Sequence, residues 1–159
     1  ASGDAHKNHK NLIDAWVLLA GDGYFPSLLL TIDHKSYPAL SRYVTDQSRK
    51  YDLKVKNVGF QGAEDLKILY AKSRALIFPS LLESFGLPLL EAKSFMLPVL
   101  ASELDYVRDV VSPDFTFDPL SPVSISRAVK RFLKIDEVSI NLLTPSQFLE
   151  SAMRHAGKY

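Results

Sequence analysis

The sequence contains no cysteine, which excludes disulfides and cysteine-based zinc sites and fits a protein of the reducing cytoplasm. No apolar run reaches the roughly 18 residues that a membrane-spanning helix needs. The first residues also lack the charged and then apolar lead of a signal peptide. Positive and negative charges nearly cancel, at a formal net charge of +1, so the composition gives no reason to expect a nucleic-acid partner.

The 159 residues are 47% apolar and 23% charged, ordinary values for a globular protein. This length suffices for one domain with its own core. Short apolar runs alternate with amphipathic stretches, a pattern typical of a parallel sheet covered by helices. We therefore expect an α/β fold, a Rossmann-like three-layer α/β/α sandwich, in residues 1–134. A connector and a C-terminal helix are expected in residues 135–159.

The expected elements follow from hydrophobic periodicity and from turn residues. Lysines in the segment 53–58 indicate a strand near the edge of the sheet. The first helix should turn one face to the core, formed by Leu12, Ala15, Trp16 and Leu19. Strands are expected at residues 27–32, 53–58, 75–78, 99–102 and 115–117. Helices are expected at residues 8–20, 37–51, 65–73, 89–95, 106–111, 122–134 and 145–155.

Two glutamates, Glu83 and Glu91, lie eight residues apart around a turn that contains Gly86 and Pro88. Pro88 suits the first turn of a helix, where its missing N–H costs nothing. The N–H groups of residues 85–87 should then lie at the helix mouth, where free N–H groups and the helix dipole attract anions. Two carboxylates beside an anion site suit a ligand with central phosphates and hydroxyls at both ends. A nucleotide sugar is such a ligand.

The pattern Glu-x-Phe-Gly-Leu-Pro-x-x-Glu closely resembles the E-x7-E signature of retaining glycosyltransferases of family 4, which have the GT-B fold. Because members of this family are much longer, we expect the chain to be an excised C-terminal, donor-binding domain, one half of a GT-B fold. Four more parts of the chain resemble family motifs and follow the family's order. They are Lys7-Asn8 together with residues 12–16, Val58-Gly59 together with residues 66–70, Ala92 together with residues 98–102, and residues 117–119.

The resemblance implies roles for both glutamates. Glu91 matches the glutamate that accepts hydrogen bonds from the ribose hydroxyls, and a carboxylate suits this because it can take both hydroxyls of a diol. Glu83 matches the glutamate that faces the transferred sugar as a positioning and electrostatic group. Each also has a plainer interpretation, Glu91 as a helix-surface residue and Glu83 as a charge that stabilises the helix N-terminus. The turn would meet the phosphates through the backbone of Ser84, Phe85, Gly86 and Leu87.

Lys7 matches the family lysine that grips the diphosphate and stabilises the charge that develops on the leaving group. It is equally interpretable as a solvated cation in the stretch 6–10. Val58 and Gly59 occupy the position whose backbone often meets the nucleobase in this family. Base recognition through the main chain leaves little trace in a sequence, so uridine and guanosine donors are not distinguished.

The chain departs from the family pattern in the phosphate clamp. The family's partner arginine would lie near Ala1 or Ser2, and no arginine is present there. His6 and Lys10 are candidates to compensate. Without compensation, we expect weaker catalysis.

Two further departures concern turns. Many members carry Gly-x-Gly after the first strand, where this chain has Asp33-His34-Lys35. Ligands bind at the carboxyl ends of strands in open α/β folds, so His34 is a candidate to line the cleft. Asp105-Tyr106 stands where the family often has Gly-Gly, and the larger side chains should narrow the cleft.

The resemblance implies a transferase that moves a sugar from a nucleotide diphosphate to a glycan or lipid-linked acceptor. The acceptor site would belong to an absent N-terminal domain, and peripheral membrane association of the full-length protein stays open. No cofactor or metal is expected, since no Asp-x-Asp pair is present and GT-B enzymes generally need none. Two alternatives remain, a nucleotide-sugar epimerase on the same fold and a non-catalytic nucleotide-binding or assembly module.

Overall fold

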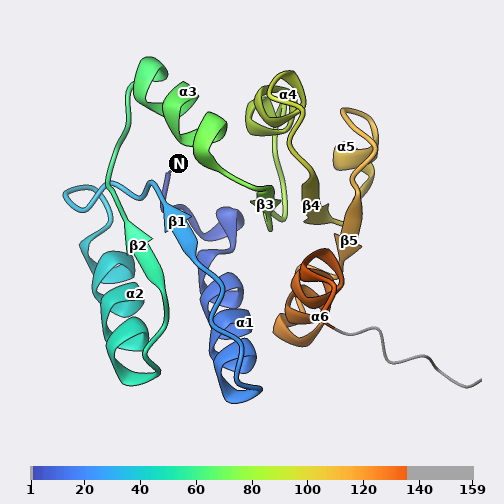
Figure 1. Cartoon of the computed structure of the whole chain (residues 1–159). Coiled ribbons are helices and arrows are strands. Elements are labelled where there is room, and N and C mark those ends of the chain that lie inside the picture. The colour runs from blue at the N-terminus through green and yellow to red at the C-terminus, as the bar shows by residue number, and fades with distance from the viewer. Residues whose placement is uncertain (1, 136–159) are drawn as a thin grey trace, which may run out of the picture.

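The computed structural model describes residues 2–135, in which strands and helices alternate along the chain (Figure 1). This confirms the predicted α/β class. The strands are β1 (Leu28–Leu30), β2 (Val55–Asn57), β3 (Leu76–Phe78), β4 (Val99–Ser102) and β5 (Phe115–Phe117). The helices are η1 (Ala5–Lys7), α1 (His9–Gly21), α2 (Pro38–Lys50), α3 (Ala63–Lys72), α4 (Leu87–Ser94), α5 (Asp105–Arg108) and α6 (Pro122–Leu133).

The strand pairs of the described residues are all parallel, as predicted. They form two hydrogen-bonded groups, β1 with β2, and β4 between β3 and β5. β2 has β1 as its single partner within residues 2–135, in agreement with the edge position that its lysines indicate. The register sets Leu30 opposite Asn57, so the two strands end side by side.

Helices cover both faces of the strands, and β4 shows this most directly. Leu100 belongs to a core cluster that includes α1 and α6. Its neighbours Val99 and Ala101 belong to a second cluster, with residues of α4 and α5. Successive side chains of a strand point to opposite faces. The alternation therefore establishes the three layers that the sequence predicts.

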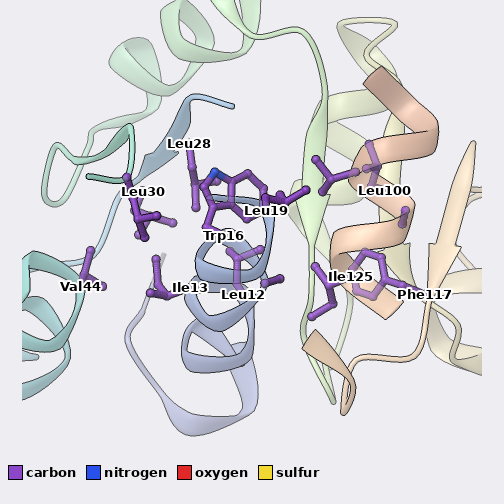
Figure 2. Close-up of a cluster of buried hydrophobic side chains, with 14 of the residues drawn as sticks. Leu12, Ile13, Trp16, Leu19, Leu28, Leu30, Val44, Leu100, Phe117 and Ile125 are labelled. Atoms are coloured by element: carbon purple, nitrogen blue, oxygen red, sulfur yellow. The ribbon is translucent and has the colours of Figure 1, made fainter. Parts of the chain in front are cut away.

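The larger core is built around α1 (Figure 2). The indole Nε1 of Trp16 donates a hydrogen bond to the Pro26 carbonyl at 2.9 Å, so the ring is buried with its N–H satisfied. This packing fixes α1, whose N-terminus carries the residues discussed below. All four residues of the predicted core face are buried and pack in a cluster that also contains Leu28, Leu30, Leu100, Phe117 and Ile125.

The boundaries of three helices differ from the prediction by two residues or more. α3 begins at Ala63, two residues before the expected start. α4 begins at Leu87 instead of residue 89, because Gly86 turns the chain and Pro88 falls within the first helical turn. α5 ends at Arg108, whereas a helix over 106–111 was expected. The predicted helix at 145–155 and most of the connector lie outside the described residues, so the domain division stays a prediction.

Candidate functional site

The chain leaves β3 along a path that three hydrogen bonds fix. The Leu81 N–H donates to the His6 carbonyl at 2.7 Å. The Ser80 carbonyl accepts hydrogen bonds from the Ser102 hydroxyl at 2.8 Å and from the Tyr106 hydroxyl at 2.6 Å. Residues of η1, β4 and α5 therefore set the position of the first motif glutamate.

That glutamate, Glu83, forms an ion pair with Lys7. The Lys7 ammonium lies 2.7 Å and 2.8 Å from the two carboxylate oxygens. The side chains are 19% and 10% exposed, respectively, so little water screens their attraction. The fold thus brings together the two residues predicted to be catalytic, although 76 positions separate them in the chain.

Asn8 connects Lys7 to α1 and holds both against the strand ends. Its backbone is left-handed, at φ 58°, a conformation that asparagine adopts more readily than most residues. Its buried side-chain Nδ2 donates to the Pro79 carbonyl at 3.1 Å and to the Pro119 carbonyl at 2.7 Å. A single amide therefore ties Lys7 to the segments that follow β3 and β5.

The turn before α4 has the backbone geometry that the predicted anion site needs. Gly86 precedes the helix in a left-handed conformation, at φ 69°. A Cβ there would lie 3.1 Å from Leu89 Cδ1, so glycine meets both a conformational and a steric requirement. The N–H groups of residues 85–87 make no hydrogen bond to any of the described residues. They form a set of free donors at the positive end of the helix dipole.

The side chains of this turn face solvent. Ser84 is exposed, and so are Phe85, at 63%, and Leu87, at 59%. The apolar side chains of Phe85 and Leu87 therefore lie outside the core. Their contribution to an anion site would come from the backbone.

Glu91 lies one helical turn into α4 and is held by Tyr70 of α3. The Tyr70 hydroxyl donates to Glu91 Oε2 at 2.8 Å, while its ring stacks on Phe95 with 5.6 Å between centroids. Burial raises the pKa of Tyr70, and the hydrogen bond to the carboxylate raises it further. The phenol therefore stays a donor at neutral pH and fixes one carboxylate oxygen.

Tyr106, one of the two residues that stand where the family often has Gly-Gly, contacts the segment between β3 and Glu83. Burial raises the pKa of Tyr106 to about 12, and the negative charge of Glu83 contributes to the rise. The bond from its hydroxyl to the Ser80 carbonyl makes it a support for the chain that leads to Glu83.

The exits of β1 and β2 are joined by the Asn57 side chain. Asn57 Oδ1 accepts from the Ile32 N–H at 2.8 Å, and Nδ2 donates to the Ile32 carbonyl at 3.0 Å. Oδ1 also accepts from the N–H of Gly59, at 3.3 Å. Val58 and the buried Gly59, the residues predicted to meet the nucleobase, therefore lie on a fixed segment.

Lys10, a candidate to replace the absent arginine, is directed elsewhere. Its ammonium lies over the Tyr43 ring of α2, 5.9 Å from the centroid. The neighbouring His9 is buried, and burial together with nearby positive charge lowers its pKa to about 4. Neither side chain adds a free cation beside Glu83.

A hollow of about 770 Å³ opens beside the end of β5. Its walls are mainly apolar, and none of the predicted donor-binding residues lines it. The lining includes Leu81, Leu104, Phe117, Pro119 and Leu120.

The predicted site residues thus fall into three places, the Lys7–Glu83 pair, the α4 turn with Glu91, and the segment at Val58. Their roles stay predictions. Of the supporting residues, Asn57 was missed, Asn8 and Tyr70 were noted only as parts of motifs, and Tyr106 was expected to narrow the cleft and not to support the chain before Glu83. Within residues 2–135, no group of three histidine or acidic side chains is arranged to hold a metal, and no helix has the length and apolarity to cross a membrane.

A family model described as glycosyl transferases group 1 matches residues 2–142. The chain belongs to this family. Among curated relatives of this glycosyltransferase domain is the O-antigen chain mannosyltransferase B of Escherichia coli, 36% identical over 83 residues. The match covers 52% of this chain and 22% of the relative, so the domain corresponds to about a fifth of that protein.

Solved structures show the same fold. A glycosyltransferase from Rickettsia africae superposes with a TM-score of 0.74 at 19% identity, over 87% of this chain and 37% of the other. The Anabaena protein HepE, solved with UDP and glucose, superposes with a TM-score of 0.67 at 20% identity, over 87% of this chain and 38% of the other. The glycosyltransferase domain therefore has the fold of one half of a GT-B enzyme.

Proposed function

We propose that this domain binds the nucleotide-diphosphate sugar donor of a retaining glycosyltransferase. The observation that carries the proposal is the turn before α4. Its free N–H groups lie, along the chain, between Glu83, which Lys7 holds, and Glu91, which Tyr70 holds. The donor's diphosphate would bind the N–H groups of residues 85–87, assisted by the helix dipole. The ribose would bind Glu91, and the sugar would face Glu83.

Tyr70 prepares Glu91 for the ribose. Its hydroxyl occupies Oε2 and fixes the carboxylate plane, which leaves Oε1 and the remaining lone pair of Oε2 to accept from the ribose diol. A carboxylate already oriented loses little rotamer freedom when the ligand binds.

Lys7 serves the leaving group. During transfer, the bond between the anomeric carbon and the β-phosphate oxygen breaks, and negative charge accumulates on the diphosphate. The free N–H groups of the α4 turn and the Lys7 ammonium would stabilise this charge without a metal. Lys7 also neutralises Glu83, whose carboxylate would otherwise repel the phosphates.

The acceptor is proposed to be a glycan or a lipid-linked glycan, bound by a part of the enzyme that this domain does not include. The curated relative's name makes mannose the first sugar to test, and the UDP in the HepE structure makes uridine one base to test alongside guanosine. We also propose that the reaction takes place in the cytoplasm, since a chain without cysteine suits reducing conditions.

Calorimetric titration of the 159-residue chain with UDP and GDP tests donor binding. Glu91→Ala should weaken binding of the preferred nucleotide by tenfold or more, because a charge-assisted contact to the ribose is lost (about 1.5–3 kcal/mol). Asp46→Ala, which removes an exposed carboxylate from α2, is the control and should leave binding unchanged. Absence of binding up to millimolar nucleotide, by the chain and by the full-length protein, would favour an assembly module.

Product analysis of the full-length protein with GDP-mannose and UDP-glucose separates the enzyme classes. A new glycosidic bond with the donor's anomeric configuration supports a retaining transferase, whereas inversion at a sugar carbon without transfer supports an epimerase. The chain alone is expected to bind nucleotide and transfer little, and robust transfer by it would contradict that expectation.

A further inference from the structure

We propose that His34 reads the nucleobase of the donor through a hydrogen bond from its Nε2–H, an assignment that rests on the proposed function. His34 is exposed and lies in the turn after β1, beside the exit of β2. Asp33 holds this turn by accepting hydrogen bonds from the N–H groups of Lys35 and Tyr37, both at 3.0 Å. A donor aimed from a fixed turn into a ligand site is suited to select between ligands.

The orientation of the Asn57 amide determines what His34 can do. Asn57 Oδ1 accepts from two backbone N–H groups, those of Ile32 and Gly59, and Nδ2 donates to the Ile32 carbonyl. If the amide were flipped, its NH2 group would face the two backbone N–H groups and its oxygen would face the Ile32 carbonyl, so its orientation is unambiguous. The second hydrogen of Nδ2 is then available to His34.

The contact between the two side chains sets the tautomer of His34. Asn57 Nδ2 lies 3.5 Å from His34 Nδ1, a long contact in which the amide is the donor. Nδ1 therefore acts as the acceptor, and we assign the proton of the neutral ring to Nε2. That nitrogen, on the opposite side of the ring from Nδ1, is a hydrogen-bond donor.

The ring is also placed beside the segment predicted to meet the base. A Cβ on Gly59 would lie 3.5 Å from His34 Cδ2 and 3.8 Å from Nε2, so the imidazole edge lies on the side of Gly59 where a side chain would point. Gly59 has φ +78°, a conformation that favours glycine, and a glycine has no side chain between its Cα and the ring.

The backbone N–H groups of Val58 and Gly59 are both occupied. The Val58 N–H is used by the Leu30 carbonyl at 2.8 Å, and the Gly59 N–H by Asn57. The Val58 carbonyl accepts from Gln61 Nε2 at 2.9 Å and retains a second lone pair. These two residues can therefore offer a base acceptors only.

Uracil and guanine each present a ring N–H beside a carbonyl oxygen, so a protein that reads this edge needs an acceptor and a donor side by side. The Val58–Gly59 carbonyls can supply the acceptor. His34 Nε2–H, held within reach of Gly59, supplies the donor.

The test compares two near-isosteric variants on three probes, UDP, GDP and ribose 5-diphosphate, by titration of the 159-residue chain. His34→Gln places an amide near Nε2, whereas His34→Asn places one near Nδ1 only. His34→Asn should weaken binding of the preferred nucleotide about fivefold, the value of one hydrogen bond, and leave ribose 5-diphosphate unchanged. His34→Gln should bind the nucleotide within about twofold of the original chain.

Each result decides. Equal weakening of nucleotide and ribose 5-diphosphate by His34→Asn, or no change in either, would overturn the assignment while leaving the proposed function intact. Equal affinity of the original chain for all three probes would do the same, because no base would then be read. If the original chain bound none of them, the proposed function would fail, and this assignment with it.

Discussion

The ammonium of Lys7 contacts both carboxylate oxygens of Glu83, at 2.7 Å and 2.8 Å. The residue predicted to hold the diphosphate is thus bound to the residue predicted to face the sugar. This pairing matters because an unneutralised carboxylate beside the α4 turn would oppose the binding of phosphates. It also means that the two partners should respond differently to mutation.

Lys7→Met should weaken binding of the preferred nucleoside diphosphate by about tenfold or more, since a charge-assisted contact is lost and Glu83 becomes an unpaired negative charge. Glu83→Gln should bind the same nucleotide as well as the original chain or better, because Lys7 is released toward the phosphates. In the full-length enzyme, both should reduce sugar transfer. Calorimetry provides the affinities.

The matched control for Lys7 is Lys67→Met, which removes an exposed lysine paired with Glu64 on the surface of α3. Binding should not change. Weakening of diphosphate binding by Glu83→Gln to the extent seen with Lys7→Met would show that the pair acts only as a structural brace.

Tyr70→Phe should weaken nucleotide binding about threefold to tenfold, because Glu91 loses the hydrogen bond that orients it. The stacking on Phe95 persists, so the melting temperature should change little. Inorganic pyrophosphate, which has no ribose, should bind the variant and the original chain equally. A matching loss for pyrophosphate would instead indicate that the helix mouth is disturbed.

Asn8→Gly should lower the free energy of unfolding by about 1–3 kcal/mol, because the buried Pro79 carbonyl loses its donor and the Pro119 carbonyl keeps only Asn11, while glycine keeps the left-handed backbone. Asn8→Ala should cost about 1 kcal/mol more, the added strain of a Cβ at positive φ. Urea unfolding measures both. Equal stability of the two variants would show that the backbone conformation contributes nothing.

His9 should make the fold sensitive to mild acid. Burial and nearby positive charge lower its pKa to about 4, and its Nδ1 has no hydrogen-bond partner among the described residues. Between the unfolded pKa, about 6.5, and pH 4, the unfolded chain binds a proton that the folded chain excludes. The stabilisation is therefore complete above pH 6.5 and is lost as the pH falls toward 4.

The loss should approach about 1.4 kcal/mol per pH unit in that window. His9→Gln, which stays neutral throughout, isolates this effect from carboxylates that titrate nearby in pH. Denaturant unfolding of both proteins at pH 4.5, 5.5 and 7 gives the two slopes. Parallel slopes would contradict the burial of a neutral His9.

Much of the fold follows from local signals that act over a few residues. The buried face of α1 around Trp16 was predicted from helical spacing, and α6 begins at residue 122, as predicted. The start of α4 at Leu87 was not predicted, because it depends on the left-handed turn at Gly86. Turn conformations of this kind are set by contacts, here with Leu89, that periodicity does not encode.

The candidate site divides in the same way. Glu83 and Glu91 stand out because spacing around a Gly-Pro turn is visible in one short segment. Tyr70 and Asn57 become meaningful only when α3 and the β1 exit are placed against their partners. The sequence made Lys10 a candidate to replace the absent arginine, yet in the structure its ammonium lies over the ring of Tyr43 in α2.

The sequence by itself determined the order of the elements, the family resemblance and the turn predicted to bind an anion, because each depends on residues close together along the chain. The tertiary structure alone decided that Lys7 pairs with Glu83 and that the His34 ring lies beside Gly59. Such pairings require distant segments to meet where parallel strands end. That meeting is fixed by the packing of the core and by buried amides such as Asn8, whose carbonyl partners lie 71 and 111 positions away.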